Sequence, residues 1–404
     1  MTMNNNDLID NGQLTIDNAN NNCPLSILNC QLSMVDLHRQ YLRLKPDVDR
    51  AMQQVLESTA FINGPQVKEF ATNFANYLNI PYVIPCGNGT DALQIALMAL
   101  DLRPGDEVIV PAFTYVAAAE VVALLGLIPV WVDVEPETFN INPSLIEGAV
   151  SPRTKAIVAV HLFGQSCDME PILRIASQNN LYVIEDNAQS VGAVYTFSDG
   201  TKKKTGTMGH IGTTSFFPSK PLACYGDGGA IMTSDSYWAE RLRMIASHGQ
   251  QIKYHHKIVG CNSRLDTLQA AVLNVKLPHL DAFNEARRQV ATRYDEALGG
   301  NPLWTIPERR PYSTHVYHQY TLRVKDGKRD ELQAYLKEQG IPSMIYYPLP
   351  LQKQEAFYGF ARKGSSLHVA EQLTKEVLSL PIHTEMTDAE IDFIIDKMNR
   401  FTGK

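Results

Sequence analysis

The feature that most restricts the fold of this chain is an alternation of short apolar runs with stretches of helical periodicity. The runs follow one another between residues 82 and 233, and apolar residues at helical spacing separate most of them. This alternation is typical of an α/β domain with a mostly parallel sheet. Seven strands are expected: Tyr82–Pro85, Glu107–Pro111, Pro129–Val134, Ala156–His161, Tyr182–Glu185, Thr213–Phe217 and Gly229–Thr233.

Helical periodicity also flanks this region on both sides. Before it, the spacing of apolar residues predicts helices over 47–57 and 67–78. The segment Phe61–Pro65 between them must be a loop because glycine and proline adjoin there. After the strands, a long helical region spans 265–297 and is interrupted at Pro278.

In the C-terminal part, the spacing of apolar residues follows another pattern. It predicts a strand over 319–324, a helix over 329–339, a strand over 343–347 and then helices. A length of 404 residues exceeds the roughly 250–300 residues that one core usually serves. We therefore predict three parts: a disordered Asn-rich tail over 1–33, a large domain over 34–282 and a small α+β domain over 283–404.

The N-terminal tail lacks the basic segment followed by an apolar segment that is typical of a secretory signal. Met34 opens the segment MVDLHRQY, which has the character of a folded domain. One hypothesis is that translation begins at Met34, and the alternative is that it begins at Met1. Native protein whose measured mass begins at Met1 would contradict the first hypothesis.

Composition excludes several classes of protein. The formal charge is −7, and the 36 lysines and arginines are scattered, which argues against a nucleic-acid partner. The longest apolar stretch, 121–132, is shorter than the ~20 residues of a membrane span. The six cysteines include no C-x-x-C pair, so we expect no metal site and a reducing cytoplasm.

Ligands of open α/β sheets bind beyond the carboxyl ends of the strands, so the loops there are informative. The loop 87–92 matches G-x-G-x-x-A and opens a helix, whose free amides suit a phosphate, although a plain tight turn is the alternative. A dinucleotide site would place a carboxylate after the next strand. That strand is followed instead by Tyr115, which suits stacking on a flat ring or a place in the core.

Two further loops carry charged residues. Asp186 ends a strand, where a desolvated carboxylate needs a cation such as a protonated pyridine nitrogen; capping of a helix is the alternative. Lys220 follows an aromatic strand and precedes the glycine-rich turn 226–229. A lysine is usually a surface cation, but burial lowers its pKa and makes it a Schiff-base former. Together the four loops meet the needs of pyridoxal 5'-phosphate.

The sequence resembles the sugar aminotransferases of the DegT/DnrJ/EryC1/StrS family from about Met34 to Phe401. This resemblance implies fold type I of pyridoxal phosphate enzymes, with an aspartate-aminotransferase-like seven-stranded sheet domain. The motifs that carry it are GTDAL (89–93), PAFTYVA (111–117), EDNAQS (185–190), SFFPSK (215–220), GDGGA (226–230), NSRLDTLQAA (262–271) and LSLPIH (378–383).

The resemblance also implies roles for individual residues around the cofactor ring. Lys220 is expected to form the imine with the cofactor and to act as general acid and base. Asp186 is expected to pair with the pyridine nitrogen, Gln189 to contact the ring hydroxyl, and Tyr115 to stack on the ring.

Other residues are implied as ligands of the cofactor phosphate. These are Gly89, Thr90 and Ser215, together with Asn262, which in the family reaches the phosphate from a second subunit. The resemblance therefore implies a homodimer with shared active sites.

The substrate is also suggested by resemblance. GDGGA, with Asp227 rather than Glu, resembles members that aminate carbon 3 rather than carbon 4 of the sugar. The strings over 215–230 and 248–271 are most similar to enzymes that aminate UDP-2-acetamido-2-deoxy-3-keto-glucuronate for surface polysaccharide such as lipopolysaccharide O-antigen. Glutamate is the expected amino donor. The alternatives are an aminotransferase for a dTDP-3-keto-6-deoxyhexose or a 4-keto sugar, a sugar dehydratase, which would carry His at position 220, and a non-catalytic regulator.

Two residues bear on substrate recognition. Arg264 can pair a carboxylate through two hydrogen bonds, so it is expected to bind the uronate. Lys253, His255, His256 and Lys257 lie in the same segment and equally suit a solvated basic loop. Tyr346 stands where many relatives carry His before Tyr-Pro, so we expect it in a sugar pocket that differs from theirs.

Overall fold

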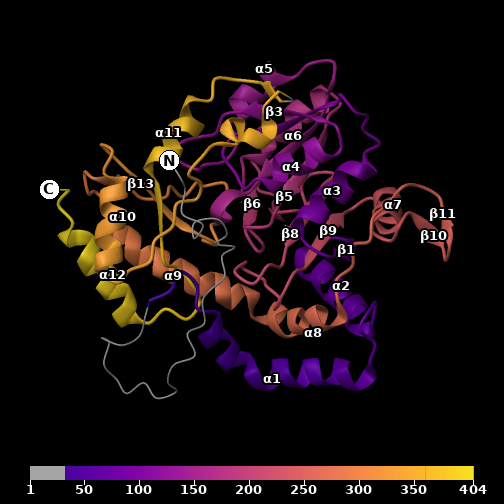
Figure 1. The fold of residues 1–404 in the computed structure, drawn as a ribbon, viewed down its shortest axis with the longest axis horizontal. Coiled ribbons are helices and arrows are strands. Elements are labelled where there is room, and N and C mark those ends of the chain that lie inside the picture. Colours follow the sequence, from indigo (N-terminus) through magenta and orange to yellow (C-terminus); the bar gives the residue numbers. More distant parts are fainter. Residues whose placement is uncertain (1–31, 360, 404) are drawn as a thin grey trace, which may run out of the picture.

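The structure, a computed structural model, describes residues 32–359 and 361–403. Its centre is an eight-stranded sheet in the order β1-β9-β8-β5-β4-β2-β3-β14 (Figure 1). All strands from β8 to β14 in this order run parallel, whereas β9 is antiparallel to both of its neighbours. The strands are β1 Tyr82–Cys86, β2 Glu107–Pro111, β3 Ile128–Val132, β4 Thr154–Val160, β5 Tyr182–Asp186, β8 Ile211–Ser215, β9 Gly229–Thr233 and β14 Arg362–Lys363.

All seven strands predicted from the apolar runs are therefore confirmed. The eighth strand, β14, comes from the C-terminal part and pairs with β3 at one edge of the sheet. The shorter strands outside the sheet are β6 Val194–Thr196, β7 Lys202–Lys204, β10 Gln250–Ile252, β11 His255–His256, β12 Trp304–Thr305, β13 Tyr320–Val324 and β15 Val377–Leu380. The hairpin β10–β11 projects from the body of the molecule (Figure 1).

Helices cover both faces of the sheet. Those that precede or follow the first strands are α1 Leu37–Ser58, α2 Pro65–Leu78, α3 Gly89–Ala99, α4 Ala117–Leu124, α5 Ile146–Ala149, α6 Met169–Gln178, α7 Ser236–Ala246 and α8 Thr267–Lys276. The later helices are α9 Leu280–Leu298, α10 Arg329–Glu338, α11 His368–Glu376 and α12 Asp388–Arg400. Short 3-10 turns lie at Pro143–Leu145, Leu162–Gly164, Leu277–His279, Leu351–Lys353 and Glu355–Phe357.

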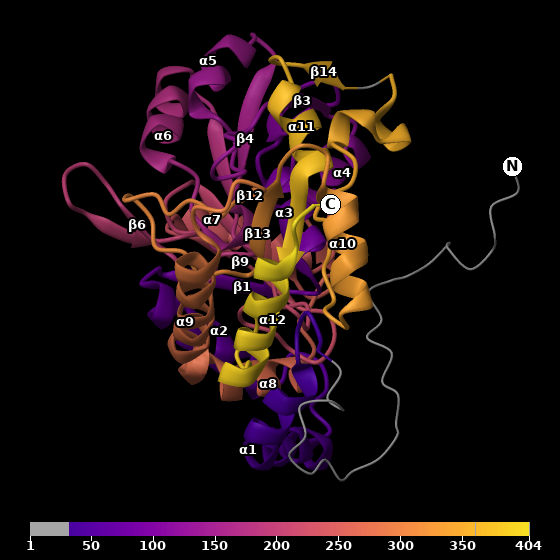
Figure 2. The ribbon, with the colours of Figure 1, turned by 90° about the vertical axis from the view of Figure 1, so that its left-hand side faces the viewer.

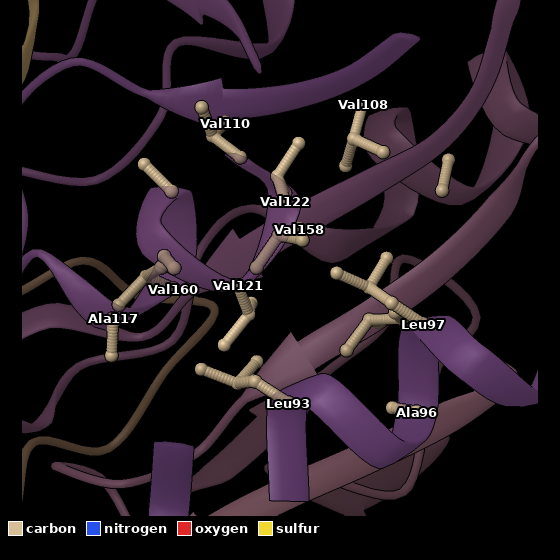
Figure 3. Packing of buried hydrophobic residues seen from close by; sticks show 14 of the residues in the cluster. Leu93, Ala96, Leu97, Val108, Val110, Ala117, Val121, Val122, Val158 and Val160 are labelled. Atoms are coloured by element: carbon tan, nitrogen blue, oxygen red, sulfur yellow. The ribbon is translucent and has the colours of Figure 1, made fainter. Parts of the chain in front are cut away.

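Successive residues of the central strands are buried on opposite faces. Val108 and Val110 of β2 pack against α3 and α4 in one apolar cluster (Figure 3). Ile109, between them, belongs to a second cluster with α6. Because side chains alternate along a strand, burial on both faces requires a layer of helices on each side, as a parallel sheet normally has.

The first helix is longer than its apolar pattern predicts. It begins at Leu37, ten residues before the expected start at residue 47, and contains Pro46. The side chain of Asp36 caps it by accepting a hydrogen bond from the amide of Arg39 at 2.8 Å. Arg39 also pairs with Glu390 at 2.8 Å, so polar contacts add to the burial of Leu44 in holding the turns before the proline.

The C-terminal part contains a small antiparallel sheet in the order β12-β13-β15. The strand predicted over 343–347 is wrong, since Met344 forms only an isolated bridge to Ser379. The third strand is instead β15, in a region predicted to be helical. A buried run of four residues directly after a helix cannot be assigned from periodicity alone.

The C-terminal part also returns to the large sheet, as the position of α11 and β14 beside β3 shows (Figure 2). Arg362 donates two hydrogen bonds, of 3.1 and 2.8 Å, to the fully buried carboxylate of Glu107 at the start of β2. Asp133, just after β3, accepts from the amides of Val369 and Ala370 at 2.9 and 2.8 Å. These two buried carboxylates fasten the segment 362–370 to the sheet.

Several expectations about composition can be compared with the described residues. No helix among them is long and apolar enough to cross a bilayer. Cys86, Cys167, Cys224 and Cys261 are free thiols. The other two cysteines and nearly all of the predicted 1–33 tail lie outside the described residues, and the division into two domains at residue 282 stays a prediction.

We expect Arg362→Ala to lower the free energy of unfolding by about 1.5–3 kcal/mol, because the buried Glu107 then loses hydrogen bonds from a charged donor. Chemical denaturation measures this change. The matched control is Arg293→Ala, whose partners Asp388 and Asp392 are exposed, and it should cost less than about 1 kcal/mol. Equal losses in the two variants would contradict the role given to Glu107.

Candidate active site

Three of the predicted loops meet because their strands or helices are neighbours. Asp186 is the last residue of β5 and Ser215 is the last of β8, and these two strands pair in parallel. Gly89 begins α3 immediately beyond β1. A Cβ built on Gly89 would lie 2.6 Å from the Cβ of Ser215, so the two residues are in direct contact and only glycine fits.

The start of α3 forms a cradle for an anion. The side chain of Asn88 caps the helix by accepting from the amide of Asp91 at 2.8 Å. The amides of Gly89 and Thr90 donate to no group in the described parts of the chain. With the hydroxyls of Thr90 and Ser215 beside them, these free donors suit a phosphate.

Asp186 provides a buried carboxylate with few partners. It accepts one hydrogen bond, from the amide of Ala188 at 3.0 Å, and forms no ion pair with a described residue. Burial raises its pKa above the ordinary value, although the amide of Ala188 and the charge of Lys220 oppose the shift. Such a group is stabilised by a cationic donor, and a protonated pyridine nitrogen has that chemistry.

Lys220 provides the opposite charge. It closes a tight turn, in which its amide donates to the carbonyl of Phe217 at 2.8 Å. Its half-buried side chain forms no ion pair or hydrogen bond with a described residue. Burial lowers the pKa of Lys220 to about 8, although Asp186 opposes the shift, so roughly a tenth of the amine is neutral and nucleophilic at pH 7, far more than for an ordinary lysine.

Glu185, which the sequence analysis did not single out, fixes the end of β5. Its fully buried carboxylate bonds His161 Nε2 at 2.8 Å. It also accepts from the amides of Gly206, Met208 and Gly209 at 2.6–2.8 Å. Since neighbouring strand residues point to opposite faces, this anchoring on one face holds Asp186 on the other. The only sign of this role in the sequence is that Glu185 is an acidic residue directly before Asp186.

Gln189 and Tyr115 are connected through a residue that the sequence analysis missed, Tyr347. The side chain of Gln189 accepts from the amide of Phe163 at 2.8 Å and donates to the Tyr347 hydroxyl at 3.3 Å. The ring of Tyr347 lies 6.2 Å from that of Tyr115 and 6.0 Å from that of Phe113. Tyr115 itself is 56% exposed, so one face of its ring is open to a ligand.

Tyr346 is half-buried beside Tyr347, with 6.0 Å between the ring centres. Burial raises the pKa of its hydroxyl, although a hydrogen bond with Gln319 opposes the shift. The rings of Tyr346 and Tyr115 thus both lie close to that of Tyr347, and the sugar pocket expected around Tyr346 stays a prediction.

The side chains of Asn262 and Arg264 form no hydrogen bond or ion pair with the other site residues in the described ranges, although Ser263 between them accepts from the amide of Gly87 at 2.9 Å. Ser263 and Leu265 point inward and are buried, whereas Asn262 and Arg264 alternate with them and are exposed. The Arg264 guanidinium has no ion-pair or hydrogen-bond partner among the described residues. Both side chains thus face away from their own core.

Comparison with known proteins identifies the family of this chain and, through the family, its cofactor. The model of the DegT/DnrJ/EryC1/StrS aminotransferase family matches residues 43–399. The chain belongs to this family. The resemblance inferred from its motifs is therefore confirmed, as is the fold class of a pyridoxal phosphate enzyme of fold type I.

Individual relatives in this family cover almost the whole chain. The UDP-2-acetamido-2-deoxy-3-oxo-D-glucuronate aminotransferase of Pseudomonas aeruginosa is 47% identical over 90% of this chain and 98% of its own length. A protein of Geobacillus stearothermophilus named pleiotropic regulatory protein is also 47% identical, over 91% and 98% respectively. The crystal structure of NtdA from Bacillus subtilis with bound cofactor PMP superposes with a TM-score of 0.84 at 32% identity, over 91% of this chain and 84% of that one.

The chain is thus an aminotransferase that depends on pyridoxal phosphate, which confirms the predicted enzyme class and cofactor. When bound, this cofactor supplies an electron sink that stabilises negative charge on the substrate carbon. The residues described above fit this cofactor. They provide backbone amides without partners at the start of α3, an exposed aromatic ring, a buried carboxylate without a cationic partner and an amine with a lowered pKa.

We expect the reaction of Lys220 with an aldehyde probe in the cofactor-free enzyme to accelerate as the pH rises through about 8, because the neutral amine is the nucleophile. Mass spectrometry of the adduct after borohydride reduction measures the rate at this residue. Lys220→Ala is the control and should give no adduct at the site. A midpoint near that of an ordinary lysine, 10.5, would contradict the burial argument.

Proposed function

We propose that this aminotransferase acts on carbon 3 of UDP-2-acetamido-2-deoxy-3-keto-glucuronate, with glutamate as amino donor. The reaction would take place in the cytoplasm and supply amino sugars for surface polysaccharide such as lipopolysaccharide O-antigen. The observation that carries the proposal is the 47% identity with the Pseudomonas aeruginosa aminotransferase over nearly the full length of both chains.

Within this proposal, Lys220 would hold the cofactor at its aldehyde, and its amine, when free, would move a proton at the reacting carbon of the substrate. Asp186 keeps the pyridine nitrogen protonated, Gln189 contacts the ring hydroxyl and Tyr115 stacks on the ring. The support is the burial of the two opposite charges and the exposed face of Tyr115. Because Tyr347 bonds Gln189 and lies beside Tyr115, it would hold both in place.

The cofactor phosphate would bind the amides and hydroxyls around Gly89, Thr90 and Ser215. Asn262 of the partner subunit would complete this set, which requires a homodimer with two shared sites. The outward orientation of Asn262 supports this arrangement, because the side chain is exposed and turned away from its own core.

Arg264 shares the outward face of Asn262 and would therefore enter the same neighbouring site. Its free guanidinium can hold a carboxylate through two parallel hydrogen bonds, and a uronate offers that group at carbon 6. The half-buried Tyr346 would face the sugar from the other chain.

A panel of UDP- and dTDP-linked keto sugars, with mass spectrometry of the aminated products, tests the substrate. We expect Arg264→Ala to lower kcat/KM for the keto uronate about 10–100-fold, because a charge-assisted contact is lost. The matched substrate is UDP-N-acetyl-3-keto-glucosamine, which lacks the carboxylate and should change less than about threefold.

Equal losses with both substrates would contradict the role of Arg264. A product aminated at carbon 4, or a preference for dTDP sugars, would replace the proposed substrate. A deoxygenated product would indicate dehydratase chemistry, and a specific gel shift with genomic fragments would indicate a regulatory role.

Hybrid dimers test the shared site. We expect Lys220→Ala and Asn262→Ala homodimers each to have low activity, and their mixture after subunit exchange to regain up to about a quarter of wild-type activity. The gain arises because a hybrid dimer contains one site with both wild-type residues. Failure of an exchanged mixture to gain activity would contradict the contribution of Asn262 from a partner.

A further inference from the structure

Ser263 is a buried serine whose hydroxyl joins two distant segments of the predicted site. Its side chain lies between the outward-facing Asn262 and Arg264, and the residue is 2% exposed. The hydroxyl oxygen accepts from the amide of Gly87 at 2.9 Å and donates to Oδ2 of Asp91 at 2.6 Å. It therefore bonds the loop after β1 and the first turn of α3, which lie 176 and 172 residues earlier in the chain.

On one side, Ser263 fixes the start of the phosphate cradle. Asp91 directly follows Thr90 in the first turn of α3, and its amide donates to the capping side chain of Asn88. A Cβ built on Gly87 would lie 3.1 Å from Oδ2 of Asp91 and 3.3 Å from the hydroxyl of Ser263, so only glycine leaves enough room between them. The helix dipole favours a carboxylate in this turn, and the bond from Ser263 holds that carboxylate beside Gly87.

On the other side, Ser263 sets the direction of its two neighbours. Its amide donates to the carbonyl of Ala246 at 3.0 Å, which fastens the backbone of the segment to the end of α7. Because successive side chains of an extended segment alternate, the inward position of Ser263 leaves Asn262 and Arg264 exposed. The carbonyl oxygen of Arg264 would lie 3.7 Å from a Cβ on Gly87, so this segment packs directly on the loop before the cradle.

We propose that Ser263 is a positioning residue that connects the phosphate cradle of its own subunit with Asn262 and Arg264, the two side chains that would serve the site of the partner. A buried hydroxyl with both of its hydrogen bonds made to one loop leaves little freedom of movement. A displacement of Asp91 would therefore move the segment 262–264, and the reverse. The inference rests on the proposed function, because it requires the homodimer with shared sites.

Hybrid dimers with one complete site test this connection. The cofactor subunit carries Asn262→Ala and keeps Lys220, whereas the arm subunit carries Lys220→Ala and keeps Asn262. Different affinity tags on the two subunits allow the hybrid alone to be purified. The complete site then uses the cradle of the cofactor subunit and the segment 262–264 of the arm subunit, and a further substitution can be placed in either subunit.

The first readout is the dissociation constant of pyridoxal phosphate, measured from the visible absorbance band that only a site with Lys220 gives. We expect Ser263→Ala in either subunit to raise this constant about 3–10-fold, the net effect of about one hydrogen bond. Asp91→Ala in the arm subunit should raise it as well, although that Asp91 belongs to the cradle of the other site. Both substitutions together in the arm subunit should raise it no further than Ser263→Ala alone, since they break the same contact.

The second readout is the kinetics of the same hybrids at saturating cofactor. We expect Ser263→Ala in the arm subunit to raise KM for the keto sugar about 3–10-fold with kcat within about twofold, because Arg264 is less well placed while Lys220 is undisturbed. In the cofactor subunit, Ser263→Ala should leave this KM within about twofold of the parent hybrid, since the segment 262–264 of that subunit does not serve the complete site.

The matched control is Ser247→Ala in the arm subunit. Ser247 forms a backbone bridge with Asn262, and its hydroxyl bonds no residue in the described ranges. Both constants should therefore stay within about twofold of the parent hybrid. A change in the cofactor constant with Ser263→Ala in one subunit only, or in neither, would overturn the proposal. If Ser263→Ala does not fold, an unchanged constant with Asp91→Ala in the arm subunit would overturn it.

The shared site can fail separately from this inference. A parent hybrid without activity and without the absorbance band would overturn the contribution of Asn262 from a partner, and the proposed connection with it. An active parent hybrid that Ser263→Ala in the arm subunit leaves unchanged would overturn only the connection through Ser263.

Discussion

The site depends on two opposite charges that burial holds close to each other without a direct ion pair. Asp186 and Lys220 stand in loops at the ends of paired strands, and each shifts the pKa of the other against the larger effect of burial. A direct bond between them would satisfy both groups and leave neither free for a ligand. Their separation leaves a buried acid that is able to accept from a cation and an amine that is able to attack an aldehyde.

The rest of the structure keeps these charges in place. Glu185 ties the end of β5 to His161 and to three backbone amides, so the adjacent Asp186 cannot turn toward solvent without breaking buried hydrogen bonds. The contact of Gly89 with Ser215 brings α3 against β8 and sets the distance between the phosphate cradle and the lysine turn. The residues predicted to bind the cofactor are thus held at strand ends and in the short turns directly after them.

The sequence predicted much of this because the strands are short, fully buried and separated by strong helical patterns. It also singled out Asp186 and Lys220, because the four loops taken together favoured a cofactor site over the ordinary role that each residue could have alone. It did not identify Tyr347, which comes from a distant segment and forms a hydrogen bond with Gln189. Nor could it place β15, because a four-residue apolar run after a helix fits either structure.

The fastening of the C-terminal part to the sheet has a consequence for how such enzymes diversify. Met344 bonds the small sheet through Ser379, and the amide of Leu351 donates to the carbonyl of Ala112 at 3.0 Å, so the loop that bears Tyr346 is tied at both ends. An exchange at Tyr346 can therefore change the predicted sugar pocket while the two ends of the loop stay fastened. Tyr347, the next residue, is less free to change, because its hydroxyl accepts a hydrogen bond from Gln189.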